Sequence, residues 1–195
     1  MTQSMLLLIL ILLWSTVLLV LHLVFIIIRR VNAIYALFEQ RPDLQVGAPA
    51  PDFDAETLTG EKVTLTTYFG REVAFIFMEP HCGACRREIP TLELLGPLAK
   101  KNFDVDFVIV IESTVADAKR FVKEFKMKLP VIVAPRKKSD FGKDYNPAGI
   151  NPYYCYIDKQ GNVRARDPLG KGEWTRLQHM WASEKTPQRS FNRYT

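Results

Sequence analysis

An uninterrupted apolar run divides this chain into a helix of membrane length and a separate folded part. The run, from Met5 to Ile28, reads MLLLILILLWSTVLLVLHLVFIII and has about 24 residues, enough to cross a bilayer with some tilt. A cleaved signal peptide instead has a basic start, an apolar stretch of roughly 7–15 residues and small residues at the cleavage site. Here the start carries no Lys or Arg, and Arg29-Arg30 follows the run directly. We therefore expect an uncleaved anchor over residues 1–30, which contacts the membrane through residues 5–28.

The charges around this run bear on its orientation. Arg29, Arg30 and Arg41 all follow the run, and nothing basic precedes it. The positive-inside rule places such residues on the cytoplasmic side, which by itself would put the rest of the chain in the cytoplasm.

Composition and breaks in the pattern define the remaining segments. The chain is 48% hydrophobic and 24% charged, which suits a folded protein. Val46 to Pro51, VGAPAP, is broken by proline and therefore extended, so we place a domain boundary there. We expect a juxtamembrane connector over residues 31–45, a folded domain over 46–184 and a polar tail over 185–195.

The net charge of +5 does not indicate a nucleic-acid partner. Lys and Arg are scattered in small groups with Asp and Glu among them, and they form no basic surface interleaved with aromatic residues. We expect no binding to nucleic acid.

The periodicity of the folded part predicts an α/β domain. Apolar runs indicate buried strands, and the helices between them and a late hairpin predict a mixed sheet flanked by helices. The predicted strands cover residues 73–78, 105–111 and 129–134, with hairpins at 53–65 (turn at 59–61) and 153–166. The predicted helices cover residues 82–100 (interrupted at Pro90), 114–126, 139–145 and 172–181.

Two of the three cysteines, Cys82 and Cys85, form a C-G-A-C motif where a helix should begin after a buried strand. The positive end of the helix dipole and the unpaired N–H groups of the first turn favour a thiolate at Cys82. Cys85 lies three residues on, on the same helix face and within disulfide reach. We interpret Cys82 as the nucleophile and Cys85 as the resolving thiol. Half of a zinc site is the alternative, but no second C-x-x-C or nearby H-x-x-x-H supplies further ligands.

Three segments, in the expected order, resemble redoxin domains, in particular the TlpA-like and ResA-like membrane-tethered thioredoxins. They are Val46 to Phe53 (VGAPAPDF), Val73 to Pro90 (VAFIFMEPHCGACRREIP) and Gly149 to Gly161 (GINPYYCYIDKQG). The anchor and the opening are also similar to those of MauD, the methylamine-utilisation accessory thioredoxin. The resemblance implies a thioredoxin-like fold and a thiol–disulfide oxidoreductase that acts on protein thiols and disulfides together with a redox partner. We expect neither a cofactor nor a metal.

The resemblance also implies roles for residues around the motif. It makes Pro152 a cis-proline whose loop faces the cysteines, with the backbone of Asn151 pairing with a substrate strand. Glu88 lies three residues after Cys85, where ResA-like proteins carry an acid implicated in proton handling; a solvated helix carboxylate is the alternative. We therefore expect Cys82, Cys85 and Glu88 to be catalytic.

The residues next to the cysteines depart from the family pattern. His81 stands where Trp is usual, and it either tunes the Cys82 thiolate or faces solvent as a loop residue. Gly83 and Ala84 lack the common proline, which leaves the direction of electron transfer open. We expect His81, Gly83, Ala84, Asn151 and Pro152 to contact the substrate.

Other functions were weighed against the oxidoreductase. A peroxiredoxin of the AhpC/TSA type would need P-x-x-x-T-x-x-C, whereas Phe75 and Glu79 occupy the Pro and Thr positions. A copper-handling module could add His81 and His179 to the cysteines, although copper-assembly relatives space their cysteines by three residues instead of two. An inert binding domain would not need an intact C-x-x-C.

The third cysteine, a basic loop and the side of the membrane each have two possible interpretations. Cys155 is a buried core thiol, with a third redox partner as the alternative. The basic group Arg136-Lys137-Lys138 is a solvated loop, with a docking patch for an acidic partner as the alternative. Because tethered domains of this type work where disulfides persist, we expect a single-pass protein with its C-terminal domain on the extracytoplasmic (periplasmic) side, against the charge pattern.

Overall fold

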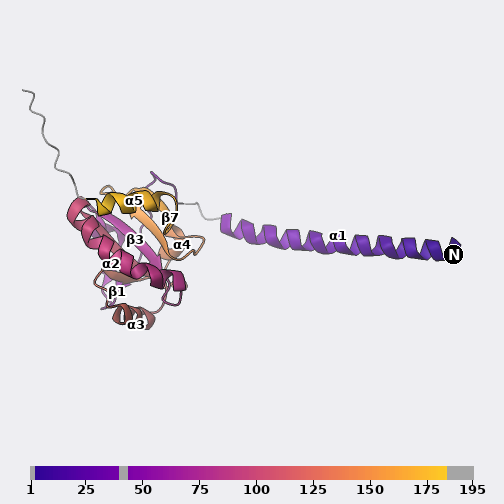
Figure 1. The fold of residues 1–195 in the computed structure, drawn as a ribbon, viewed down its shortest axis with the longest axis horizontal. Coiled ribbons are helices and arrows are strands. Elements are labelled where there is room, and N and C mark those ends of the chain that lie inside the picture. Colours follow the sequence, from indigo (N-terminus) through magenta and orange to yellow (C-terminus); the bar gives the residue numbers. More distant parts are fainter. Residues whose placement is uncertain (1–2, 40–43, 184–195) are drawn as a thin grey trace, which may run out of the picture. The chain divides into compact units, whose positions relative to one another are not determined.

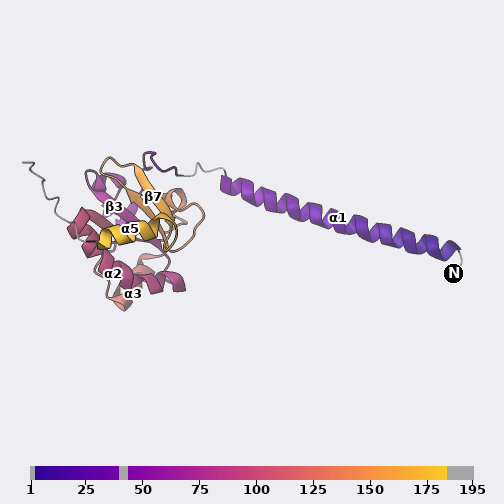
Figure 2. The same cartoon turned by 45° about the horizontal axis from the view of Figure 1, so that its top comes forward.

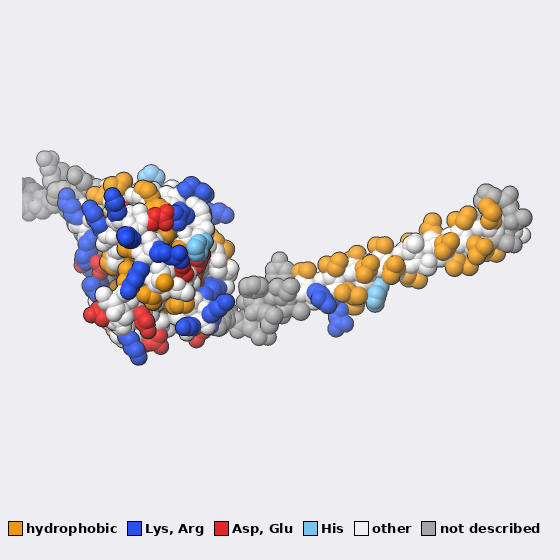
Figure 3. Space-filling view, turned by 90° about the horizontal axis from the view of Figure 1, so that it is seen from below, with side chains coloured by type: hydrophobic (Ala, Val, Ile, Leu, Met, Phe, Trp, Pro, Cys, Tyr) orange, Lys and Arg blue, Asp and Glu red, His pale blue; other side chains and the backbone are white. Residues whose placement is uncertain are grey.

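The computed structural model describes residues 3–39 and 44–183 and divides the chain into two compact units, Met1–Pro42 and Asp43–Thr195. The first unit is one helix, α1 (Gln3–Glu39). Its segment Leu7–Asn32, 26 residues, is long and apolar enough to cross a membrane. Hydrophobic side chains cover the helix face seen in Figure 3. The helix continues into the segment predicted as a connector, and the predicted tail at 185–195 lies outside the described residues.

The second unit is built on a seven-stranded mixed sheet with the strand order β2-β1-β5-β4-β3-β6-β7. The three central strands, β3, β4 and β5, are parallel, and all other neighbours pair antiparallel. The strands are β1 (Ala55–Thr57), β2 (Lys62–Val63), β3 (Glu72–Met78), β4 (Val105–Ile111), β5 (Val131–Val133), β6 (Tyr153–Ile157) and β7 (Val163–Pro168).

Helices cover both faces of this sheet, as the sequence predicted. Successive side chains of a strand point to opposite faces. The even-numbered residues of β3 from Ala74 to Met78 pack in one cluster with α2, α3 and α5, and the odd-numbered residues from Val73 to Phe77 pack with α4 (Figures 1 and 2). The helices are α2 (Gly83–Phe103), α3 (Val115–Phe125), α4 (Phe141–Tyr145) and α5 (Glu173–Ala182).

The ends of the two long helices have identifiable chemical causes. The Thr114 hydroxyl accepts a hydrogen bond from the backbone N–H of Asp117 at 3.2 Å and caps α3. Helix α2 begins after Cys82 and ends at Asp104, whose left-handed backbone (φ 59°) stops the helix. These boundaries fix the position of Cys82 at the carboxyl end of β3.

Two details of the predicted elements were wrong. Helix α2 runs through Pro90 without interruption, because one missing N–H removes one hydrogen bond and the burial of flanking residues keeps the helix in place. Leu65 begins a 3₁₀ helix (Leu65–Tyr68) and does not extend strand β2.

Candidate active site

Cys82 lies at the junction between β3 and α2. Its backbone N–H donates to the carbonyl of Glu79 at 3.0 Å, which closes a tight turn after the strand. As the N-cap of α2, its Sγ accepts a hydrogen bond from the backbone N–H of Cys85 at 3.4 Å. The sulfur therefore occupies the place that a Ser or Asp oxygen takes in an ordinary helix cap.

This position lowers the pKa of Cys82. Burial of the partly exposed thiol acts in the opposite direction, but hydrogen bonds from the N–H and thiol of Cys85 and from the N–H of Ala84 stabilise the thiolate. The positive charge of Arg87 adds to them. The pKa of Cys82 consequently lies below its ordinary value of 9.0.

Cys85 is buried one turn into α2, and its thiol has the opposite character. Burial raises the pKa of Cys85 to about 12. A backbone hydrogen bond from Glu79 lowers it, whereas the hydrogen bond with Cys82 and the negative charges of Cys82 and Glu79 raise it further. The two thiols are free in the structure, and the partly exposed thiol of Cys82 is the one whose lowered pKa favours the thiolate.

The loop before β6 faces the cysteines. The Asn151–Pro152 peptide bond is cis, as the resemblance implied. The thiol of Cys82 donates to the backbone carbonyl of Asn151 across 3.5 Å, within the range for sulfur. A peptide that pairs with this backbone would pass directly over the sulfur.

The other predicted site residues lie around Cys82 with different exposures. His81 and Gly83 are exposed, and Ala84 is half-buried. Glu88 is half-buried on α2, and within residues 44–183 it makes no hydrogen bond to either sulfur. The structure thus brings Cys82, Cys85 and Asn151 together, whereas the role of Glu88 stays a prediction.

Glu79 is a carboxylate that the sequence interpretation missed. It directly follows β3 and is half-buried. Burial is the largest influence on its pKa and raises it, and the negative charges of Asp117 and Glu112 also raise it. The backbone hydrogen bond from His81 and the charge of that residue lower the pKa, but the net shift is upward. The signal was its place at the carboxyl end of a buried parallel strand, the edge of the sheet where Cys82 also lies.

The cysteines and histidines outside this centre are dispersed. Cys155 lies on β6 and is fully buried, as expected for a core thiol. His179 is exposed on α5. Across the described ranges 3–39 and 44–183, no three His, Cys, Asp or Glu side chains are grouped so as to hold a metal ion.

Comparisons with known proteins agree with this geometry. A family model described as Redoxin matches residues 45–173. The thiol–disulfide oxidoreductase ResA of Bacillus cereus is 29% identical over 141 residues, which cover 72% of this chain and 78% of that protein. The thioredoxin-like protein YneN of Bacillus subtilis is 29% identical over 126 residues, 62% of this chain and 70% of that protein.

Solved structures of the same fold extend the comparison. A putative protein disulfide isomerase from Bacteroides thetaiotaomicron superposes with a TM-score of 0.60 at 25% identity, covering 70% of this chain and 87% of that one. A putative thiol:disulfide interchange protein DsbE from Chlorobium tepidum superposes with a TM-score of 0.58 at 24% identity, covering 71% and 97%.

Proposed function

The chain belongs to the redoxin family and is a thiol–disulfide oxidoreductase of thioredoxin-like fold, and we propose that Cys82 and Cys85 are its reacting groups. The observation that carries the proposal is the division of labour between the two thiols. Cys82 has a lowered pKa and faces the cis-proline loop, whereas Cys85 is buried with a pKa raised to about 12.

The reaction follows from that division. The Cys82 thiolate attacks one sulfur of a substrate disulfide, so that a mixed disulfide forms and the other substrate sulfur leaves as a thiolate. Cys85 then loses its proton and attacks the Cys82 sulfur, which releases the second substrate thiolate and leaves a Cys82–Cys85 disulfide. Two electrons pass from the protein to the substrate, and the same steps run backwards when the protein oxidises a dithiol.

Protein thiols and disulfides are the general substrates of such an enzyme. We place the substrate strand against the backbone of Asn151 and Pro152, with His81, Gly83 and Ala84 contacting it from the other side of the sulfur. A specific redox partner would restore the starting state of the two cysteines. The Gly83-Ala84 dipeptide helps to set the reduction potential of the two cysteines, and that potential determines which direction of electron transfer is favoured. Titration against glutathione buffers measures it.

The cysteine assignment is tested by three single variants. Cys82→Ser should abolish disulfide exchange, and Cys85→Ser should accumulate mixed disulfides that a gel without reducing agent resolves. Cys155→Ala is the matched control, because it removes a thiol on the opposite face of the sheet, and its exchange rate should stay unchanged. Faster alkylation of Cys85 than of Cys82 in the reduced protein would contradict the assignment.

We further propose that α1 tethers the protein to a membrane. Leu7–Asn32 would be roughly 39 Å long at 1.5 Å per residue, more than the ~30 Å hydrocarbon core. The protein should therefore stay in the membrane pellet after alkaline carbonate washing, and a variant lacking residues 1–30 should be released. If the protein expressed with residues 1–30 is instead found in the supernatant and is shorter by the length of the apolar run, the run is a cleaved signal sequence.

A further inference from the structure

Glu112 is a buried carboxylate beside the cis-proline loop. It directly follows β4, and its backbone N–H donates to the carbonyl of Met78 at the end of β3 at 3.1 Å. Its side chain is 3% exposed. A carboxylate at this depth requires strong partners, because an uncompensated buried charge is costly.

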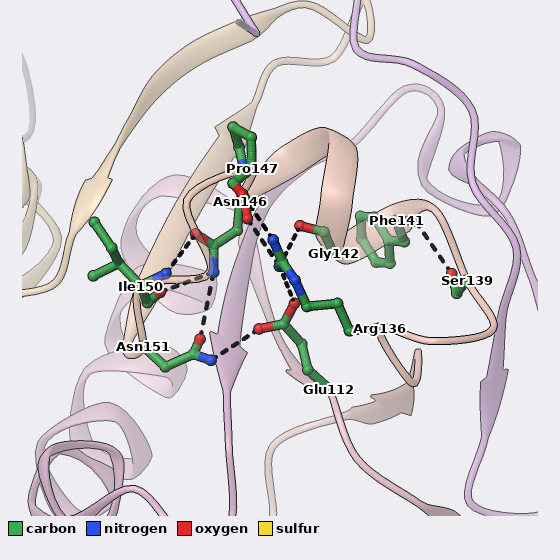
Figure 4. Close-up of polar contacts among 9 residues, drawn as sticks. All are labelled: Glu112, Arg136, Ser139, Phe141, Gly142, Asn146, Pro147, Ile150 and Asn151. Atoms are coloured by element: carbon green, nitrogen blue, oxygen red, sulfur yellow. Dashed lines mark hydrogen bonds and ion pairs between the residues drawn. The ribbon is translucent and has the colours of Figure 1, made fainter. Parts of the chain in front are cut away.

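Arg136 supplies the opposite charge, and it also donates hydrogen bonds to the backbone of α4 and of the loop that follows α4. Its Nη1 donates to Glu112 Oε1 at 3.0 Å and to the backbone carbonyls of Gly142 at 3.0 Å and Asn146 at 2.9 Å. Its Nη2 donates to the carbonyl of Pro147 at 2.8 Å (Figure 4). Arg136 is thus not the solvated loop residue that the sequence suggested, whereas its neighbours Lys137 and Lys138 are exposed.

The second carboxylate oxygen of Glu112 reaches the substrate loop. The side-chain Nδ2 of Asn151 donates to Glu112 Oε2 at 2.9 Å, and the Asn151 backbone carbonyl accepts from the Cys82 thiol. The fully buried Asn146 completes the frame: its amide binds both the N–H and the carbonyl of Ile150, at 3.1 and 2.8 Å (Figure 4).

The directions of these hydrogen bonds require two acceptor oxygens at position 112, which only a carboxylate side chain provides. The backbone of Ile150 fixes the orientation of the Asn146 amide, whose Nδ2 also faces Asn151 Oδ1 at 3.5 Å. Asn151 must therefore turn its own Nδ2 toward Glu112, where Arg136 donates from the other side. A glutamine would put an NH₂ group opposite one of these two donors.

We propose that the Glu112–Arg136 pair is a positioning device for substrate binding: it holds Asn151 so that its backbone faces Cys82 and the incoming substrate strand. The pair touches neither sulfur and acts through Asn151. This inference rests on the proposed function and adds two residues to its site. It predicts that breaking the pair weakens exchange with a peptide or protein disulfide, which needs the loop, but not attack on a small reagent, which does not.

The experiment compares two reactions in the full-length reduced protein. Glu112→Gln should lower kcat/KM for a peptide disulfide about tenfold, mainly through KM, and leave alkylation of Cys82 by iodoacetamide within about twofold. The matched control is Asp106→Asn, which removes a carboxylate paired with Arg71 and Lys100 at the opposite end of the same strand. It should change neither rate.

A double-mutant cycle tests whether Glu112 acts through Asn151. If it does, Glu112→Gln combined with Asn151→Ala should be no slower than Asn151→Ala alone, whereas independent effects would multiply. If the wild-type protein exchanges disulfides, two results would each overturn the inference and leave the proposed function standing. One is an unchanged kcat/KM in Glu112→Gln, and the other is multiplicative effects of the two substitutions in the cycle. A wild-type protein that exchanges no disulfide would overturn both.

Discussion

Two thiols three residues apart differ in pKa because one caps a helix and the other lies inside it. The Cys82 sulfur receives N–H groups of the first turn, and the Cys85 sulfur is enclosed by the core. Since the thiolate is the nucleophile, the pKa difference determines which sulfur reacts first. The proposed order of attack thus follows from where α2 begins.

This difference predicts a pH profile for alkylation. The rate at Cys82 should rise with pH with a midpoint below pH 9, because its pKa lies below the ordinary 9.0. In Cys82→Ser, Cys85 should still react only well above pH 9, because burial, the largest cause of its raised pKa, remains when the hydrogen bond and charge of Cys82 are removed. Mass spectrometry of iodoacetamide-treated protein follows each cysteine separately, with Cys155→Ala as the control for the third. Equal profiles for Cys82 and Cys85 would contradict the structure.

Glu79 should slow the attack of the Cys85 thiol on a mixed disulfide. Its negative charge raises the pKa of Cys85, and the substitution Glu79→Gln removes that charge but keeps the backbone N–H that stabilises the Cys85 thiolate. Resolution of a mixed disulfide should therefore become about threefold faster at neutral pH, which corresponds to the roughly 0.2–1 kcal/mol measured for interactions between exposed charges. Stopped-flow release of a fluorescent thiol measures this step. A slower release would mean that Glu79 instead accepts the proton of Cys85.

Glu88 should have the opposite effect if it handles that proton. Glu88→Gln should slow resolution about a hundredfold or more, the lower end of what a general base contributes, and leave the first attack by Cys82 unchanged. The pH–rate profile of the release step provides the measurement. A profile identical to that of the wild type would identify Glu88 as a solvated helix carboxylate.

The site was predictable where its chemistry is local in sequence. Cys82 and Cys85 follow from one motif after one strand, and the cis bond before Pro152 follows from the resemblance. The pair Glu112 and Arg136 was not found, because its partners lie 24 residues apart and meet only when β4 and β5 align. Arg136 in particular precedes two lysines, and three basic residues in a row indicate a surface loop.

Among the elements, the central strands were the most predictable. Strands β3 and β4 were located to within one residue, because both faces are covered and the sequence is continuously apolar. The shorter elements were less predictable, even inside the sheet: β5 is shorter than expected, and Leu65, expected at the end of β2, begins a 3₁₀ helix.

Helix α4 shows how closely an element packs on the buried pair. A Cβ added at Gly142 would lie 2.1 Å from Glu112 Oε1, and that oxygen is held by Arg136. Gly→Ala in a helix usually stabilises by up to about 1 kcal/mol. Here Gly142→Ala should instead lower the free energy of unfolding by about 1–3 kcal/mol, as overpacking does. Urea unfolding gives the value.

A second variant separates overpacking from other effects at this position. Adding Glu112→Ala to Gly142→Ala removes the atom that the new methyl group meets, so the two losses should be clearly less than additive. Additive losses, or a more stable Gly142→Ala protein, would contradict the close approach of α4 to Glu112.

At the scale of the whole molecule, a folded unit with two redox cysteines follows an apolar helix. With that helix as the proposed tether, the side of the membrane determines which substrates the folded unit meets. Disulfides persist in oxidising compartments, whereas cytoplasmic thiols are kept reduced. Arg29 and Arg30 follow the apolar run and favour a cytoplasmic location, as does Arg41, which lies outside the described residues. The positive-inside rule is a statistical bias in the distribution of basic residues, and in this chain it depends on three arginines.

We therefore predict that the catalytic unit faces the extracytoplasmic side. Alkaline phosphatase fused after Thr195 should be active and a green fluorescent protein fused there should be dark, because the first folds only outside the cytoplasm and the second only inside. Replacing Arg29 and Arg30 by Gln is the matched variant, and it should leave both readings unchanged or strengthen them, because it removes the opposing charges. Bright fluorescence with inactive phosphatase, reversed by this replacement, would show that the arginines set the topology and that the substrates are cytoplasmic proteins.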